Sequence, residues 1–188
     1  MKGLLGCLFL VSLVSCASST EGSGPYEVLE ERARDSRLAE DLTREAAALI
    51  EEDAARAESL LREALTADIF HGPAHNNLGV IFLSQGKLYE AAHEFEWARK
   101  LLPGHPDPRV NLALTLESAG RVDEALAAFD SALEVYPDYL PAIMGAAVLS
   151  LRSGRECDRL SEWLAQIATR CQDLEWQAWA RLHLADLP

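Results

Sequence analysis

Nine residues of this chain recur, in the same order, 34 positions further along. In the first copy they are Asn77, Leu78, Ser84, Gly86, Glu90, Ala91, Phe95, Ala98 and Pro103, and in the second they are Asn111, Leu112, Ser118, Gly120, Glu124, Ala125, Phe129, Ala132 and Pro137. A fixed short period predicts a row of equivalent supersecondary units rather than one irregular core. Such rows present extended surfaces, which favours the binding of other proteins over catalysis.

Each copy is typical of two helices separated by a turn. The first helix is expected to begin near Pro73, because proline is tolerated in the first turn of a helix. It is expected to end at Gly86, because glycine readily takes the left-handed conformation that closes a helix. A second helix is expected over residues 88–102, with Pro103 ending it.

Small side chains alternate with a large one where the two helices face each other. Ala91, Phe95 and Ala98 lie at steps of four and three residues, so they share one face of the second helix. Gly79 lies on the first helix, where a missing side chain lets the partner helix approach closely. We expect Phe95 to fill the space between these small residues, as close packing requires.

These residues resemble the tetratricopeptide repeat, a 34-residue unit with a Leu-Gly pair, alanines, an aromatic residue and a proline as landmarks. The Leu-Gly pair of the first copy is Leu78-Gly79. The tryptophan expected three residues before this pair is replaced by His75 here and by Arg109 in the second copy. The resemblance implies an all-α fold, in which helical hairpins stack into an α-solenoid.

The same register continues in both directions with weaker matches. It divides a repeat domain at residues 36–187 into a degenerate repeat (36–67), two repeats (72–105 and 106–139), a second degenerate repeat (140–171) and a capping helix (173–186). Asp53 is the expected N-cap of a helix. In the last repeat Arg159 replaces a landmark alanine, and Trp163 replaces the phenylalanine. We therefore expect about four hairpins and a C-terminal capping helix with one polar side.

The N-terminal segment has a different character. Residues 3–14 are almost wholly apolar but too short to span a bilayer, which needs about 20 residues. They match the apolar core of a secretory signal peptide. The stretch closes with Leu13-Val14-Ser15-Cys16, which resembles the lipobox of bacterial lipoproteins. The resemblance implies that residues 1–15 are removed as a signal peptide, that Cys16 is lipidated and that residues 16–35 form a flexible linker.

Two alternatives to a lipid anchor stay open on the sequence. A plain cleavable signal would release a soluble periplasmic or extracellular protein, and an uncleaved apolar start would leave a cytoplasmic one. In enteric-type bacteria, a residue other than aspartate after the cysteine is the pattern of outer-membrane delivery, and Ala17 stands there. We expect a lipid-anchored protein of the bacterial cell envelope, at the periplasmic face of the outer membrane.

Composition narrows the classes of partner. The formal net charge of −13 speaks against nucleic acid as a partner, because phosphates need basic patches. It permits a basic partner surface, although acidic helix faces also serve solubility.

Cys157 and Cys171 lie at the two ends of one predicted helix, roughly 21 Å apart at 1.5 Å per residue. That separation exceeds the reach of a disulfide, so we expect two reduced thiols.

No motif in the sequence assembles a reaction centre. A glycine-rich phosphate loop, a G-x-S-x-G motif and a C-x-x-C motif are all absent. His71 and His75 do not share a helix face, because His71 precedes the helix. We therefore expect neither an enzyme nor a metal or other cofactor. An accessory subunit acting on cell-wall polymer would need clustered carboxylates in the groove, where Glu117 stands alone.

The resemblance to tetratricopeptide repeats implies that the first helix of each hairpin lines a concave groove that holds protein segments. The lining residues would be Asn77, Val80, Leu83, Ser84, Val110, Asn111, Leu114, Glu117, Ser118, Met144, Val148 and Arg152. Two readings of Asn77 and Asn111 stay open, because an amide can bond a peptide backbone or brace neighbouring helices. With Arg152 as its one cation, the groove does not suit the family's chaperone-adaptor subtype, which holds a C-terminal carboxylate.

The leading hypothesis is a membrane-anchored scaffold or assembly adaptor for envelope proteins, such as those of pilus, secretion or outer-membrane assembly. A mixed apolar and amide groove suits a bound segment of low charge. The alternatives are a non-anchored spacer that oligomerises through its end repeats and an accessory subunit of a cell-wall enzyme.

Overall fold

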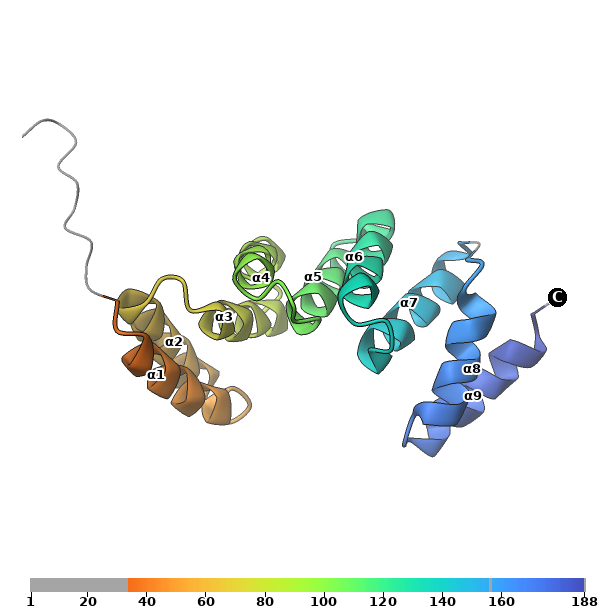
Figure 1. Cartoon of the computed structure of the whole chain (residues 1–188), viewed down its shortest axis with the longest axis horizontal. Helices are drawn as coiled ribbons and strands as arrows, with labels where there is room; N and C mark the ends of the chain where they lie inside the picture. Colours follow the sequence, from red (N-terminus) through yellow and green to blue (C-terminus); the bar gives the residue numbers. More distant parts are fainter. Residues whose placement is uncertain (1–33, 156, 188) are drawn as a thin grey trace, which may run out of the picture. The chain divides into compact units, whose positions relative to one another are not determined.

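The computed structural model describes residues 34–155 and 157–187, and within them it contains nine α-helices and no strand. The helices are α1 (Ser36–Leu49), α2 (Ala54–Ala67), α3 (Gly72–Ser84), α4 (Leu88–Leu101), α5 (Asp107–Ser118), α6 (Val122–Val135), α7 (Leu140–Ser153), α8 (Leu160–Arg170) and α9 (Leu174–Ala185) (Figure 1). The predicted all-α solenoid of about four hairpins with a terminal helix is confirmed. The predicted signal peptide, the lipobox with Cys16 and most of the predicted linker lie outside the described residues.

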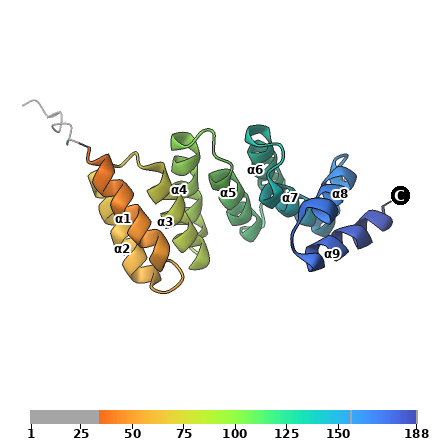
Figure 2. The same ribbon diagram turned by 60° about the horizontal axis from the view of Figure 1, so that its bottom comes forward.

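Consecutive helices pack against each other along the whole row (Figure 2). The odd-numbered helices also contact one another, α1 with α3, α3 with α5, and α5 with α7. The even-numbered helices make no such contacts within the described part of the chain. Helices α1, α3, α5 and α7 are therefore the more closely spaced side of the row, and we name α3, α5 and α7 the inner wall.

Three of the hairpins contain the same glycine turn between their helices. Gly86, Gly120 and Gly154 have φ angles of 72°, 74° and 63°, which few residues other than glycine adopt readily. The N–H of Lys87 donates to the carbonyl oxygen of Phe82 at 2.9 Å, and the equivalent bond recurs one period later. This pattern is a Schellman motif. The predicted end of the first helix at Gly86 is confirmed.

Phenylalanine and glycine pack together in the core. Phe95 and Phe129 are fully buried. A Cβ atom added at Gly79 would lie 2.6 Å from the ring of Phe95, and one added at Gly145 would lie 2.4 Å from the ring of Phe129. Real Cβ contacts are essentially never that short, so both rings occupy space that only glycine leaves free. The packing role of Gly79 was predicted, whereas that of Gly145 was not.

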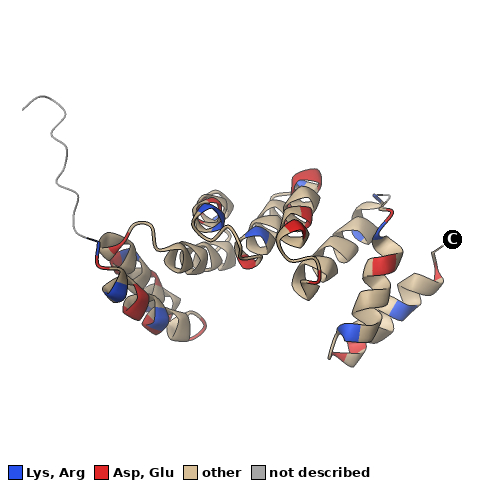
Figure 3. Ribbon diagram, in the orientation of Figure 1, with Lys and Arg blue, Asp and Glu red and all other residues tan. Residues whose placement is uncertain are grey.

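Charged residues are few on α3 and α7, which are drawn almost wholly in tan (Figure 3). Helix α3 contains no Lys, Arg, Asp or Glu, and α7 contains one charged residue, Arg152. Helix α6, on the other side, carries Asp123, Glu124, Asp130 and Glu134. The acidity of the chain is therefore carried largely outside the inner wall.

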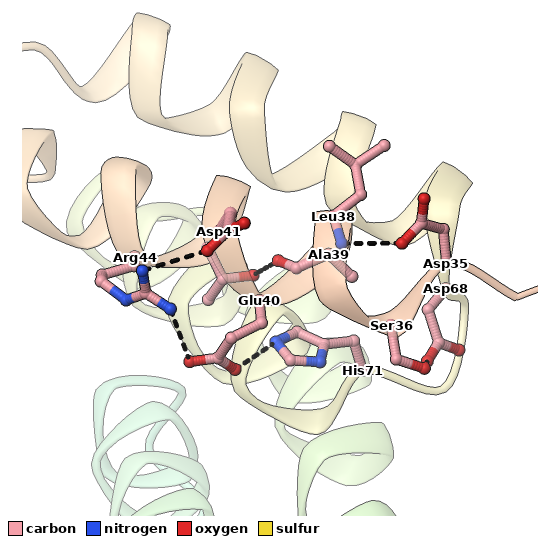
Figure 4. A network of polar contacts seen from close by, with 10 residues as sticks. Asp35, Ser36, Leu38, Ala39, Glu40, Asp41, Arg44, Asp68 and His71 are labelled. Carbon is pink, nitrogen blue, oxygen red and sulfur yellow. Dashed lines mark hydrogen bonds and ion pairs between the residues drawn. The ribbon is translucent and has the colours of Figure 1, made fainter.

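The start of the row is held by polar contacts, which Figure 4 shows from close by. Asp68 is buried between α2 and α3 and accepts hydrogen bonds from Ser36 Oγ at 2.7 Å and from the N–H of Phe70 at 3.0 Å. These bonds, with Ser36 the largest contributor, hold the pKa of the Asp68 carboxyl below its usual value. Asp35 caps α1 by accepting the N–H of Leu38 at 2.9 Å. The bond between Ser36 and Asp68 joins the start of α1 to the turn between α2 and α3.

The C-terminal helices differ in part from their prediction. Helix α8 begins at Leu160, so Cys157 precedes it instead of lying within its first turn. Neither Cys157 nor Cys171 forms a disulfide with a described residue. The capping helix α9 was expected to have a polar outer side, but Leu174 and Leu182 are 76% and 62% exposed. Its surface is therefore more apolar than a solubilising cap requires.

Candidate functional site

The inner wall presents most of the residues that the sequence predicts for a binding groove. Ser84, Leu114, Ser118 and Arg152 are exposed, and Asn77, Val80, Leu83, Asn111, Glu117, Met144 and Val148 are half-buried. Val110 is 7% exposed and belongs to the packing between helices. The accessible residues are mainly aliphatic or neutral polar, so the wall can bury apolar groups and bond backbone amides.

The asparagines of the wall form a chain of hydrogen bonds between two helices. Asn111 Nδ2 donates to Asn76 Oδ1 at 3.0 Å, from α5 to α3. Asn76 Nδ2 lies 3.4 Å from Asn77 Oδ1. Asn111 therefore braces neighbouring helices, which is one of the two roles considered for it. Asn76 was not predicted as a wall residue, because it is not one of the recurring residues.

The single cation of α7 is already paired. Arg152 Nη1 donates to Glu117 Oε1 at 2.7 Å, which joins α7 to α5. The Arg152 side chain is 68% exposed, so the pair contributes little to stability. The pair leaves the wall without an uncompensated positive charge at this position.

An open hollow of about 600 Å³ lies between α7 and α9. Its lining residues are Val148, Leu151, Arg152, Glu175, Trp176, Trp179 and His183. The rings of Trp176 and Trp179 meet edge to face with centroids 5.3 Å apart. His183 lies against Trp179 with centroids 4.6 Å apart, and its Nδ1–H donates to the Trp179 carbonyl oxygen at 2.9 Å. We name this feature the α7–α9 hollow.

Val148 and Arg152 were predicted at this place from the sequence, whereas the lining residues of α9 were not. Trp176 and Trp179 are both only half-buried. A usable signal was present, since Trp176, Trp179 and His183 lie at steps of three and four and therefore share a helix face. A stripe of this kind does not reveal whether another helix covers it.

Comparisons with known proteins decide the family of the repeats. Two models of the tetratricopeptide repeat match residues 47–106 and 82–143. The chain contains tetratricopeptide repeats. No curated protein matches the sequence significantly.

Solved structures with the same fold include other tetratricopeptide-repeat proteins. The first such domain of Spaghetti (RPAP3), bound to the HSP90 peptide SRMEEVD, is 16% identical with a TM-score of 0.60, and the match covers 64% of this chain and 97% of that one. MamA is 16% identical with a TM-score of 0.59, over 81% of this chain and 84% of that one. A mutant O-GlcNAc transferase of Thermobaculum terrenum is 23% identical with a TM-score of 0.64, but the match covers 78% of this chain and only 27% of the transferase. At these identities the likeness shows the fold alone.

The residue that replaces the landmark tryptophan of the tetratricopeptide repeat has a structural setting. His75 is buried, stacks on Trp97 and lies 2.6 Å from Glu94 through Nδ1 and 2.9 Å from the Ile69 carbonyl oxygen through Nε2. Both ring nitrogens are therefore engaged by the protein.

Within residues 34–155 and 157–187, no group of three His, Cys, Asp or Glu residues is placed to hold a metal ion. No helix of that part of the chain is long and apolar enough to cross a bilayer.

Proposed function

We propose that this tetratricopeptide-repeat protein is a non-catalytic scaffold that holds a protein segment of low charge against its inner wall. The observation that carries the proposal is the small number of charged residues on α3, α5 and α7. The inner wall has four charged residues, Asp107, Arg109 and Glu117 on α5 and Arg152 on α7, whereas α6 alone presents four carboxylates. Desolvating charged groups is costly, so a wall with few of them can be covered by an apolar or amide-rich segment at little cost.

The inner wall differs in its chemistry from a groove for acidic peptides. The peptide bound to Spaghetti, SRMEEVD, contains three acidic residues. In this chain Arg152 is paired with Glu117. Arg109 on α5 donates instead to Ser131 Oγ at 3.1 Å and to the His105 carbonyl oxygen at 3.0 Å. An acidic peptide would therefore meet few available cations, and we expect SRMEEVD not to bind.

The setting that we propose is the bacterial cell envelope. The resemblance of Leu13-Val14-Ser15-Cys16 to a lipobox supports lipidation at Cys16 and residence at the periplasmic face of the outer membrane. Two or three acyl chains hold a protein on a membrane durably, since each buried methylene contributes about 0.8 kcal/mol. A scaffold anchored in this way would serve the assembly of envelope machines. The alternative is a released spacer that oligomerises through its end repeats.

Chemical crosslinking in intact membranes, followed by purification of the chain, tests the proposed surface. Leu114 is 39% exposed on α5 of the inner wall, and Tyr89 is 84% exposed on α4 outside it. We expect Leu114→Glu to reduce the captured partner at least about tenfold, because it places a charge in a surface that must be desolvated. Tyr89→Glu is the matched control and is expected to leave capture unchanged. Equal capture by both variants would exclude the inner wall as the site.

Fractionation of membranes tests the anchor separately. Cys16→Ala is expected to move the protein from the membrane fraction to the soluble fraction or to leave it with an uncleaved leader. Mass spectrometry of the natural chain is expected to show an acylated N-terminal cysteine. An unmodified, soluble natural chain would support the released spacer instead.

A further inference from the structure

The inner wall is interrupted at its C-terminal end. Helices α1, α3, α5 and α7 contact one another in succession, but α7 and α9 make no such contact. The α7–α9 hollow of about 600 Å³ lies between them. A cavity of about 150 Å³ takes up one benzene molecule, so the hollow has room for more than one apolar side chain.

The surfaces that face this hollow are suited to apolar anchors. Val148 and Leu151 line it from α7, while Trp176 and Trp179 line it from α9. None of these four side chains is fully buried. Tryptophan is enriched among the residues that dominate protein–protein binding energies, so Trp176 and Trp179 suit a binding surface.

The charges at the rim of the hollow favour a basic partner. Glu175 is exposed and forms no ion pair with any described residue. The one cation of the lining, Arg152, is compensated by Glu117. His183 donates its Nδ1–H within its own helix. A Lys or Arg beside an apolar anchor would meet both the carboxylate of Glu175 and the face of an indole ring, which attracts cations.

We propose that the α7–α9 hollow is a subsite for a partner segment in which Leu or Phe anchors alternate with Lys or Arg. The inference rests on the proposed scaffold function: the low-charge part of the partner would lie against α3, α5 and α7, and its basic part would be confined to the α7–α9 hollow. A second copy of this chain is the less suitable occupant, because its net charge of −13 would be brought against Glu175. The exposed leucines of α9, Leu174 and Leu182, do not line the hollow.

Anisotropy of fluorescein-labelled peptides, titrated with the full chain, tests this assignment. The probes are the peptide GSFKLKGS, its anchor-free form GSAKAKGS and its acidic form GSFELEGS. We expect GSFKLKGS to bind at least about tenfold more tightly than either of the others. Trp179→Ala is expected to weaken its binding at least about tenfold, and Glu175→Gln to weaken it roughly three- to tenfold.

Control variants separate binding from folding. Leu182→Ala changes an exposed leucine of the same helix outside the hollow and is expected to leave binding of GSFKLKGS unchanged. Trp179→Phe keeps an aromatic ring and is expected to retain most of the affinity. Glu175→Gln alters an exposed side chain, so it tests the charge assignment even if Trp179→Ala unfolds α9. Circular dichroism of each variant identifies any loss of helix.

Several outcomes would overturn the inference. They are equal affinity for the lysine and glutamate peptides, unchanged affinity in Trp179→Ala, a loss in Leu182→Ala as large as that in Trp179→Ala, and no saturable binding of any peptide. Self-association of the chain that displaces GSFKLKGS would assign the hollow to a second copy and would also overturn it. The Leu114→Glu experiment is independent of these results, so the proposed scaffold function can stand where this subsite fails.

Discussion

The two central hairpins and the C-terminal end of the row follow one plan but complete it differently. In the centre, Phe95 and Phe129 are fully buried against small residues. At the end, Trp163 takes the place of the phenylalanine, and its buried Nε1 has no hydrogen-bond partner among the described residues. Arg159, in place of a landmark alanine, lies over the Trp163 ring at 5.0 Å. The end therefore keeps the fold with less regular packing.

The repeats of the centre and those of the C-terminal end differ in how far neighbouring helices cover them. In the centre, where the landmark residues are kept, each helix of the inner wall contacts the next one. Departures from the landmarks accompany the place where the wall opens, between α7 and α9. A surface that no neighbouring helix covers is available to a partner.

The largest expected effect lies in the centre. Phe95→Ala should lower the free energy of unfolding by about 3–5 kcal/mol, because it removes a fully buried ring and leaves a cavity. Urea unfolding followed by circular dichroism measures the loss. A loss below about 1 kcal/mol would mean that the central hairpins are not the most tightly packed part of the row.

The N-terminal end is expected to depend on a polar group instead. Asp68→Ala should cost about 1.5–3 kcal/mol, because it removes a buried carboxylate that accepts two hydrogen bonds. The pKa of Asp68 is lowered in the folded chain, so its contribution is present above the unfolded pKa of about 3.9 and is lost as the pH falls through the lower folded value. The deficit of the variant should therefore shrink on acidification below about pH 4. Asp41→Ala, at an exposed position of α1, is the control.

Two glycines, Gly79 and Gly145, test how tightly the buried phenylalanine rings are packed. Gly79→Ala and Gly145→Ala should each cost about 1–3 kcal/mol through overpacking against Phe95 and Phe129, less the roughly 0.5–1 kcal/mol that alanine gains in a helix. Gly104→Ala is the control, because a Cβ atom there meets nothing within 4 Å. Thermal unfolding of the three variants compares them. Equal melting temperatures would show that the rings can move away without cost.

The smallest effect is expected at Trp163. Trp163→Phe removes an unpaired buried N–H, which favours the variant, but it also loses part of a buried ring, which opposes it. We expect the free energy of unfolding to change by less than about 1 kcal/mol. A loss of several kcal/mol in urea unfolding would mean that tryptophan packs here as well as phenylalanine does in the centre.

Much of the fold could be predicted, because the spacing of the recurring residues shows which of them meet within one hairpin. Gly79 and Phe95 meet within one hairpin, so their spacing in the sequence is enough to place them together. Gly145 packs on Phe129 across two hairpins, and the landmark register points to Ala146-Ala147 instead. The position of one hairpin against the next depends on side-chain packing between them, which a short sequence pattern does not predict.

The site was predicted in part for the same reason. The residues of α3, α5 and α7 follow from the periodic register, and most of them are accessible. The α7–α9 hollow depends on how far α9 lies from α7, which is set by tertiary packing around the short helix α8. The bracing role of Asn111 likewise required the position of Asn76 on the neighbouring helix.

Site-specific photo-crosslinking tests the central claim most directly. A photoreactive residue would be placed at Ser118 on the inner wall and, in a separate variant, at Tyr89 on α4. We expect a protein partner to be crosslinked from Ser118 and not from Tyr89. Crosslinks from Tyr89 with none from Ser118 would contradict it, because the partner would then occupy the opposite side of the row.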